Sequence, residues 1–299
     1  MEFDTANLQE PVVTAFYDTA SHTFSYLVKD PDSASCAVID SVLDFDYASG
    51  TISYDSADKI IAEIRKLDLS LEYLIETHVH ADHLSAAPYI QEVLGGQIAI
   101  SKHITVIQNQ FGKLFNEGTR FQRDGSQFDI LFEDDQTYQV GSLPCRALYT
   151  PGHTPACMTH LVGSVAFVGD TLFMPDGGTA RADFPGGCAK ELYNSIQRVL
   201  ELPDETKLYM CHDYQPNGRE LAYLTTVAEQ KAHNIHVGQS VDQAQFVEMR
   251  TTRDSTLSMP RLILPSLQVN MRAGHFPEAE TNETIYLRVP ISGLKENQK

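Results

Sequence analysis

The sequence predicts a layered α/β fold. Short apolar runs typical of strands alternate with segments whose apolar residues recur at helical spacing, and this order repeats in two halves of the 299-residue chain. Residue types that bind metals follow several predicted strands, at turns of the kind that most often carry catalytic side chains. The pattern leaves the order of the strands within each sheet open.

In the first half, strands are expected at 23–28, 36–39, 71–76 and 97–101. Residues 44–55 are polar and are expected to form a loop. Ser56 then resembles a helix N-cap. The residues after it repeat at helical spacing: Ile60, Ile61, Ile64 and Leu67. Two more helices are expected near 84–94 and over 103–116.

The second half begins with a hairpin-like succession of predicted strands at 128–132, 137–140, 143–150, 157–162 and 164–169. A helix should then carry Leu192, Ile196, Val199 and Leu200 on one face, followed by a strand over 207–211. Helices are expected around 218–233 and 242–257, and strand-like apolar runs at 262–264 and 286–289.

The stretch Thr77-His78-Val79-His80-Ala81-Asp82-His83 is the most informative in the chain. It places three imidazoles and one carboxylate directly after an apolar strand. His78 and His80 are two residues apart, so on an extended segment they point the same way. Neutral imidazole and ionised carboxylate suit first-row transition metals. The alternative, a surface cluster of histidines, is much the weaker interpretation.

Three further strands end in residues of the same kind: His153 in the turn Pro151-Gly152-His153-Thr154, Asp170 after Val168-Gly169, and His212 after Met210-Cys211. One such residue is usually only solvated. Four such positions in one chain indicate a metal site.

In this order the motifs HxHxDH, PGHT, GDTLF and CHDY resemble those of the metallo-β-lactamase superfamily. The segment Ala180-Arg181-Ala182-Asp183-Phe184 is similar to that of its persulfide dioxygenase branch, which lies near the glyoxalase II thioesterases. The resemblance implies an αββα sandwich of two mixed sheets flanked by helices over residues 11–235. Residues 236–299 are then expected to be an extension of helix plus strands packed on that domain, with a role in a dimer contact.

The resemblance implies two alternative metal centres. In the dioxygenase branch, one Fe(II) per chain is held by His78, His153 and Asp170, and the second set of residues orients these ligands: His80, Asp82, His83 and His212. In a dinuclear hydrolase the two sets hold two Zn(II) ions, or mixed metals, with Asp170 as the bridge. All seven positions are filled, so counting ligands does not choose between them.

The dioxygenase resemblance favours a glutathione persulfide dioxygenase that uses O₂ and releases sulfite and glutathione. Arg181 is expected to contact an anionic part of glutathione, the alternative being an ion pair with Asp183 or Asp176. Tyr214 is expected to lie near the substrate, the alternative being a half-buried structural tyrosine. A glyoxalase II-like hydrolase of a glutathione thioester is the first alternative function, and a metal-binding scaffold or sensor without turnover is the second.

The composition of the chain limits its possible binding partners and its cellular location. The net charge of −18 argues against nucleic acid and against anionic membrane surfaces. No apolar run approaches the roughly 18 residues that span a membrane, and the first residues resemble no targeting signal. The five cysteines are odd in number and form no CxxC pair, which fits a reducing compartment. We therefore expect a cytoplasmic enzyme. A homodimer is expected as well, with residues 236–299 as a possible contact.

Overall fold

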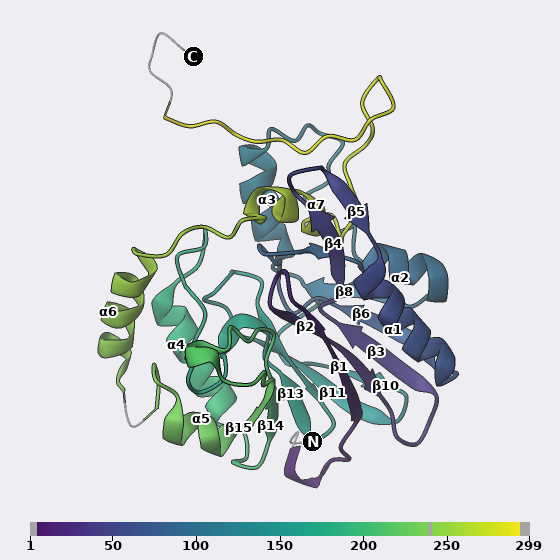
Figure 1. The fold of residues 1–299 in the computed structure, drawn as a ribbon. Helices are drawn as coiled ribbons and strands as arrows, with labels where there is room; N and C mark the ends of the chain where they lie inside the picture. Colours follow the sequence, from purple (N-terminus) through teal and green to yellow (C-terminus); the bar gives the residue numbers. More distant parts are fainter. Residues whose placement is uncertain (1–4, 239–240, 294–299) are drawn as a thin grey trace.

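The computed structural model describes residues 5–238 and 241–293, which form two six-stranded sheets packed face to face with helices on both outer sides (Figure 1). The strand orders are β1-β2-β3-β6-β8-β9 and β10-β11-β12-β13-β14-β15. Both sheets are mixed, because β3 and β6 are parallel neighbours in the first and β13 and β14 in the second, whereas most other pairs in the second are antiparallel. The expected αββα sandwich is thus confirmed.

The strands of the first sheet are β1 (Val12–Asp18), β2 (Thr23–Lys29), β3 (Ser35–Ile39), β6 (Ser70–Ile75), β8 (Gln97–Ser101) and β9 (Ile130–Phe132). Those of the second are β10 (Gln136–Val140), β11 (Leu143–Tyr149), β12 (Met158–Val162), β13 (Val165–Phe167), β14 (Lys207–Tyr209) and β15 (Leu224–Thr226). A small third sheet has the order β5-β4-β7, made of β5 (Thr51–Ser53), β4 (Val42–Asp46) and β7 (Leu84–Ser85).

Helices cover the outer face of each large sheet (Figure 1). The first sheet packs against α1 (Asp55–Lys66), α2 (Ala87–Leu94), α3 (Ile104–Leu114) and α7 (Ile263–Asn270). The second packs against α4 (Ala189–Leu200), α5 (Val227–His233) and α6 (Gln243–Asp254). No helix in the described part of the chain is both long and apolar enough to cross a membrane.

The alternation of side chains along each strand builds three apolar layers. In β2, Phe24, Tyr26 and Val28 pack between the two sheets, whereas Leu27 packs under the helices of the first sheet. Successive side chains of a strand point to opposite faces of the sheet. A central strand that is buried on both faces therefore has mostly apolar residues at successive positions. The sandwich is therefore held by a core between the sheets and one core under each helical layer.

The prediction of a loop at 44–55 is wrong, because β4 and β5 form a hairpin there. Phe45 pairs with Ile52, and both side chains pack against the core of the first sheet. The carboxylate of Asp44 accepts hydrogen bonds from the backbone N–H and the hydroxyl of Ser56. Ser56 is thus not the N-cap; it lies inside α1, and Asp44 satisfies its N–H from outside the helix.

Two further predictions fail near the C-terminus. The helix expected over 218–233 begins only at Val227, with Thr226 as its N-cap, because residues 224–226 pair with β14. The apolar run 262–264 leads into helix α7, and residues 286–289 form no strand. The described part of 236–299 therefore contains two helices and no strands. The predicted domain boundary at residue 235 stays a prediction.

Candidate metal centre

The histidine-rich segment follows β6 at one edge of the first sheet. Val79 and Ala81 point into the apolar core. The alternating residues His78 and His80 therefore point to the opposite side. His78, His80 and His83 are consequently buried, each with 2% or less of its surface exposed. Burial of these three imidazoles costs free energy unless a partner binds the ring nitrogens that face the interior: His78 Nε2, His80 Nδ1 and His83 Nε2.

The second sheet supplies the other predicted residues from three turns. His153 follows β11, Asp170 lies in a short 3₁₀ turn after β13, and His212 follows β14. The ligand atoms of His78, His153 and Asp170 lie within 4.8 Å of one another, as do those of His80, Asp82 and His83. The fold thus brings all seven predicted side chains to one edge of the sandwich, and Asp170 also groups with His212.

Each imidazole of the cluster is held by one ring nitrogen. The bonds run from His78 Nδ1 to Thr77 Oγ1 (3.0 Å), His80 Nε2 to Asp40 Oδ1 (3.0 Å), His83 Nδ1 to the Leu84 carbonyl (3.0 Å), His153 Nδ1 to the Arg181 carbonyl (2.7 Å) and His212 Nδ1 to the His22 carbonyl (3.1 Å). Metal-binding histidines are usually anchored in this way through the nitrogen that does not bind the metal.

The atoms left over fit a metal. The inward nitrogens of His78, His80 and His83 and the Oδ1 atom of Asp170 are buried and make no hydrogen bond within the described ranges. The Nε2 atom of His212 lies 3.4 Å from Asp170 Oδ1. Unpaired buried polar atoms are rare in folded proteins, and here they converge on one point. Imidazole nitrogens with a carboxylate form a donor set for zinc or iron.

The pKa values of His78, His83 and Asp82 suit metal binding, which needs neutral imidazole and ionised carboxylate. Burial lowers the pKa of His78 well below its usual value, and the neighbouring imidazoles lower it further. Burial likewise lowers the pKa of His83 to about 4. Burial alone would raise the pKa of Asp82, but the charges of His212 and His83 bring it down to about 2.

Asp40 is a site residue that the sequence analysis missed. It follows β3, and its carboxylate accepts from the N–H and hydroxyl of Thr77 as well as from His80. Burial opposes the charged form of His80, yet the Asp40 carboxylate raises the pKa of this imidazole well above its usual value. Its place at a strand end, like that of the predicted metal ligands, is a sequence feature that could have identified it.

Asn270 is a second missed residue, and no local pattern points to it. Its Nδ2 atom donates to the carbonyls of His80 and His83, and its Oδ1 accepts from the N–H of Ser85. Asn270 ends α7, so the C-terminal part of the chain braces the loop of metal ligands.

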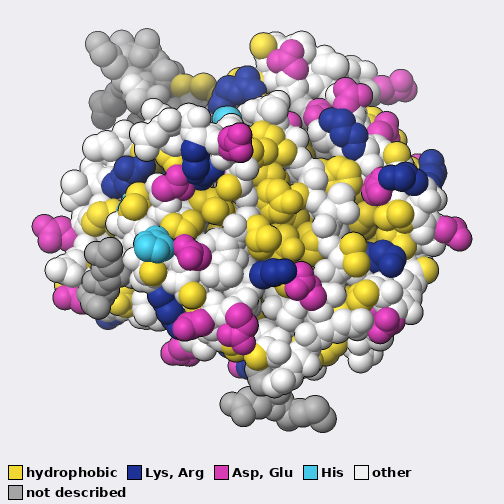
Figure 2. Space-filling model, turned by 60° about the horizontal axis from the view of Figure 1, so that its bottom comes forward, with side chains coloured by type: hydrophobic (Ala, Val, Ile, Leu, Met, Phe, Trp, Pro, Cys, Tyr) yellow, Lys and Arg dark blue, Asp and Glu magenta, His cyan; other side chains and the backbone are white. Residues whose placement is uncertain are grey.

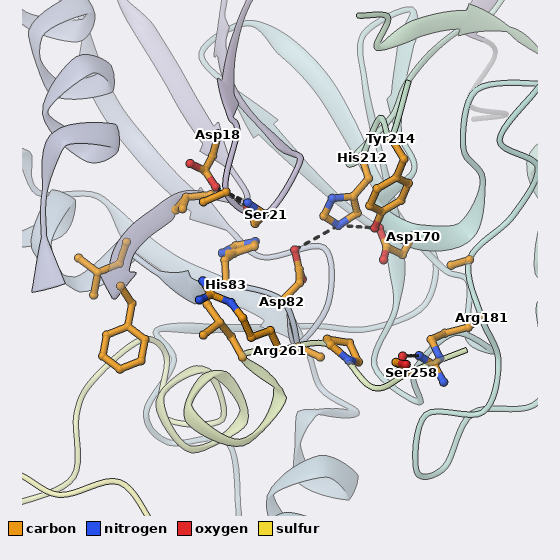
Figure 3. Close-up of a pocket in the computed structure, with 18 of the residues that line it drawn as sticks. Asp18, Ser21, Asp82, His83, Asp170, Arg181, His212, Tyr214, Ser258 and Arg261 are labelled. Atoms are coloured by element: carbon orange, nitrogen blue, oxygen red, sulfur yellow. Dashed lines mark hydrogen bonds and ion pairs between the residues drawn. The ribbon is translucent and has the colours of Figure 1, made fainter. Parts of the chain in front are cut away.

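A pocket of about 990 Å³ opens onto the cluster (Figure 3). One wall is the β4–β5 hairpin, another is the loop that contains Phe173 and Arg181, and a third is the segment from Arg250 to Leu262. Clefts of this size typically hold small-molecule ligands.

The structure places both predicted substrate contacts on the pocket. Arg181 forms the ion pair with Asp183 that was its alternative interpretation, with Nε 2.5 Å from Oδ1, and Asp176 pairs instead with Arg219. Tyr214 is 55% exposed, so it is not a half-buried structural residue, and its ring stacks on His212 at 5.7 Å between centroids (Figure 3). A role for either residue in substrate binding stays a prediction.

Fold and site together define a metal-dependent enzyme built on an αββα sandwich. The family model described as the metallo-β-lactamase superfamily matches residues 18–212, and the chain belongs to this superfamily. It is an enzyme of that superfamily, which sets aside the interpretation as a scaffold without turnover.

Similar proteins carry different names. A probable metallo-hydrolase of Burkholderia pseudomallei is 55% identical, over 94% of this chain and 99% of its own length. Glyoxylase B2 of Dictyostelium discoideum is 44% identical, with 95% and 98% covered. The human mitochondrial persulfide dioxygenase ETHE1 is 29% identical, with 86% and 87% covered. The crystal structure of ETHE1 from Myxococcus xanthus superposes with a TM-score of 0.70 at 29% identity, covering 88% of this chain and all of that one.

Proposed function

We propose that this enzyme is an iron-dependent dioxygenase that oxidises glutathione persulfide. The observation that carries the proposal is the grouping of His78, His153 and Asp170, of which His153 and Asp170 line the pocket. Two imidazoles and one carboxylate on one face are the ligand set of non-haem Fe(II) oxygenases. The likeness to ETHE1 in sequence and structure supports the same choice.

The balanced reaction is GSSH + O₂ + H₂O → GSH + SO₃²⁻ + 2 H⁺. The S–S bond breaks, the outer sulfur gives up four electrons to O₂, and glutathione leaves as the thiol. When bound, iron supplies the redox chemistry, and the protein supplies binding and orientation. The carbonyl of Arg181 fixes the ring of His153, and Asp40 fixes that of His80.

A dinuclear hydrolase of a glutathione thioester is the second candidate. All seven side chains of a two-metal site are present, and the inward nitrogen of His83 is as unsatisfied as that of His78. The similarity to a probable metallo-hydrolase favours this candidate too. In it, Asp170 would contribute to both metal sites, and the metals would supply Lewis-acid activation of water for hydrolysis.

Two measurements separate the candidates. The first is metal analysis of protein purified without added metal: about one iron per chain supports the dioxygenase, and about two zinc per chain supports the hydrolase. The second is oxygen uptake with glutathione persulfide, with sulfite measured alongside. Equal amounts of oxygen consumed and sulfite formed are expected. Turnover of S-lactoylglutathione in the absence of oxygen, without any persulfide oxidation, would overturn the proposal.

A further inference from the structure

We infer that Arg253 and Arg261 form an anion-binding subsite in the wall of the pocket, which receives a carboxylate of a glutathione-like peptide ligand. The ligand class rests on the proposed function. The subsite itself rests on which guanidinium groups in the pocket are still available.

Four arginines line the pocket: Arg181, Arg250, Arg253 and Arg261. Two of them are already engaged. Arg181 donates to both carboxylate oxygens of Asp183 and to the Ser258 carbonyl. Arg250 donates to Asp254 and to the carbonyl of Thr179, and it is buried. The guanidinium of each therefore already has protein partners.

The other two are uncommitted. Within residues 5–238 and 241–293, neither Arg253 nor Arg261 makes a side-chain hydrogen bond or ion pair, and both are exposed. A guanidinium carries five N–H donors in a planar fork that matches a carboxylate. These two side chains are therefore the arginines of the pocket that can bind a ligand without first breaking a hydrogen bond or ion pair, although the charge of Arg261 also acts on the exposed carboxylate of Asp46.

Figure 3 places Arg181 and Arg261 on different sides of the metal cluster. Arg261 lies on the side of His83, whereas the guanidinium of Arg181 turns toward Ser258 on the opposite side (Figure 3). If the sulfur of a ligand lies at the metal cluster, a carboxylate of that ligand can therefore bind on the Arg261 side of the pocket. The facing hairpin contributes Phe45 and Ile52, which offer apolar contact to the body of such a ligand.

The charge of the molecule makes a local cation necessary. The net charge is −18, and the pocket itself contains Asp18, Asp44, Asp46, Asp82 and Asp170. On the face shown in Figure 2, Lys and Arg side chains are scattered among Asp and Glu and form no continuous basic surface. An anionic ligand gains attraction only where guanidinium groups are close and unpaired.

Both arginines lie outside the part of the chain that the family model covers, which ends at residue 212. Arg253 is in the last turn of α6, and Arg261 precedes α7. The predicted metal ligands lie within residues 18–212, which the family model covers, whereas this wall of the pocket lies in the C-terminal segment. The subsite therefore sets which anionic ligand is accepted, and the metal cluster sets the chemistry.

The test is calorimetric titration of the protein as purified with S-methylglutathione, which carries the carboxylates but no persulfide. Arg253→Gln, Arg261→Gln and the double variant are compared with the parent, and Arg65→Gln is the matched control. Arg65 is an exposed arginine of α1 that does not line the pocket. Lysine at both positions keeps the charges and should retain part of the binding.

Loss of a charge-assisted hydrogen bond should weaken binding roughly ten- to a hundredfold in each single variant. Arg65→Gln should bind like the parent, and metal content should not change in any variant. The diethyl ester of the ligand, which lacks both carboxylate charges, should bind the parent and the double variant equally. Binding of S-methylglutathione by the double variant as tightly as by the parent would overturn the subsite, as would absence of binding in the parent.

Oxygen uptake distinguishes this failure from a failure of the proposed function. If the parent oxidises glutathione persulfide and the double variant has the same KM, the subsite is wrong and the function stands. If the parent oxidises none but binds S-methylglutathione through the two arginines, the dioxygenase is wrong and the subsite stands.

Discussion

The imidazole of His153 donates from Nδ1 to the backbone carbonyl of Arg181 over 2.7 Å. This bond joins a predicted metal ligand to the loop that forms one wall of the pocket. The same loop is fixed from behind, because the N–H of Ala182 donates to Asp254 on α6. Displacement of the loop would therefore reorient the ring of His153, so the pocket wall and the metal centre are mechanically one unit.

Asp170 should be indispensable for metal binding. Its carboxylate groups with His78 and His153 and also with His212, and no other described residue takes part in both groups. We expect Asp170→Ala to lose its metal and all activity, as measured by elemental analysis and turnover. His233→Ala, a change of an exposed histidine on α5, should keep both. Full metal and full turnover in Asp170→Ala would refute the assignment.

His212 reports on the number of metals. If one iron is bound by the first group, His212→Ala should keep about one iron per chain and lower the rate, because His212 then only orients its neighbours. If two ions are bound, the same change should leave about one of the two. Metal analysis of the variant beside the parent gives the answer, and a fall from two ions to one would favour the hydrolase.

The ion pair of Arg250 and Asp254 should be important for stability. The two side chains are 1% and 5% exposed, and their shortest N–O distance is 2.7 Å. Removal of one partner of a buried pair leaves a charge without compensation, so Asp254→Ala should lower the free energy of unfolding by about 3–5 kcal/mol. Urea denaturation of protein with the same metal content measures it.

The control for this prediction is an exposed pair. Asp204→Ala breaks the surface contact with Lys231 and should cost less than about 1 kcal/mol. Substitution of both Arg250 and Asp254 by apolar residues of similar volume should be less harmful than Asp254→Ala alone. Equal losses in the buried and exposed single variants would contradict the prediction.

Asp30 should make stability depend on pH in the acid range. Burial alone would raise the pKa of this carboxyl, but hydrogen bonds from the N–H groups of Ser142 and Asp32 and from the hydroxyls of Ser33 and Ser142 lower it to about 2. A carboxyl whose pKa falls on folding stabilises the folded state above the unfolded pKa of about 4. This contribution is lost as the pH falls from about 4 to about 2.

Asp30→Asn should therefore be less stable than the parent at neutral pH, and its free energy of unfolding should change less between pH 4 and pH 2. Urea denaturation over this range tests both statements. Glu205→Gln, an exposed substitution, should follow the parent curve. An Asp30→Asn curve parallel to that of the parent would show that Asp30 does not carry the effect.

The metal cluster could be predicted from sequence because each ligand is marked locally. Every one follows an apolar strand, and the strands β11, β13 and β14, which precede His153, Asp170 and His212, run in the same direction and so end at one edge. The hairpin of β4 and β5 was missed because its apolar residues, Phe45 and Ile52, are separated by polar ones that face solvent. The run 262–264 was misread because three apolar residues fit a helix as well as a strand.

No local sequence pattern identifies several other residues of the site. Asn270 braces the ligand loop across more than half of the sequence, and only tertiary packing brings it there. The same holds for Arg253 and Arg261, whose position in the pocket follows from how α6 and α7 pack on the sandwich. Contacts of this kind depend on the completed fold and have no periodic pattern to reveal them.

The brace by Asn270 bears on how the enzyme is made. Ribosomes synthesise a protein from its N-terminus, and folding follows the same direction. All seven metal-site side chains have been synthesised once His212 is in place, whereas the third pocket wall is completed only at Leu262 and the brace only at Asn270. Premature termination between His212 and Leu262 would release a product that contains every metal-site side chain but lacks both the brace on their loop and the completed third wall of the pocket.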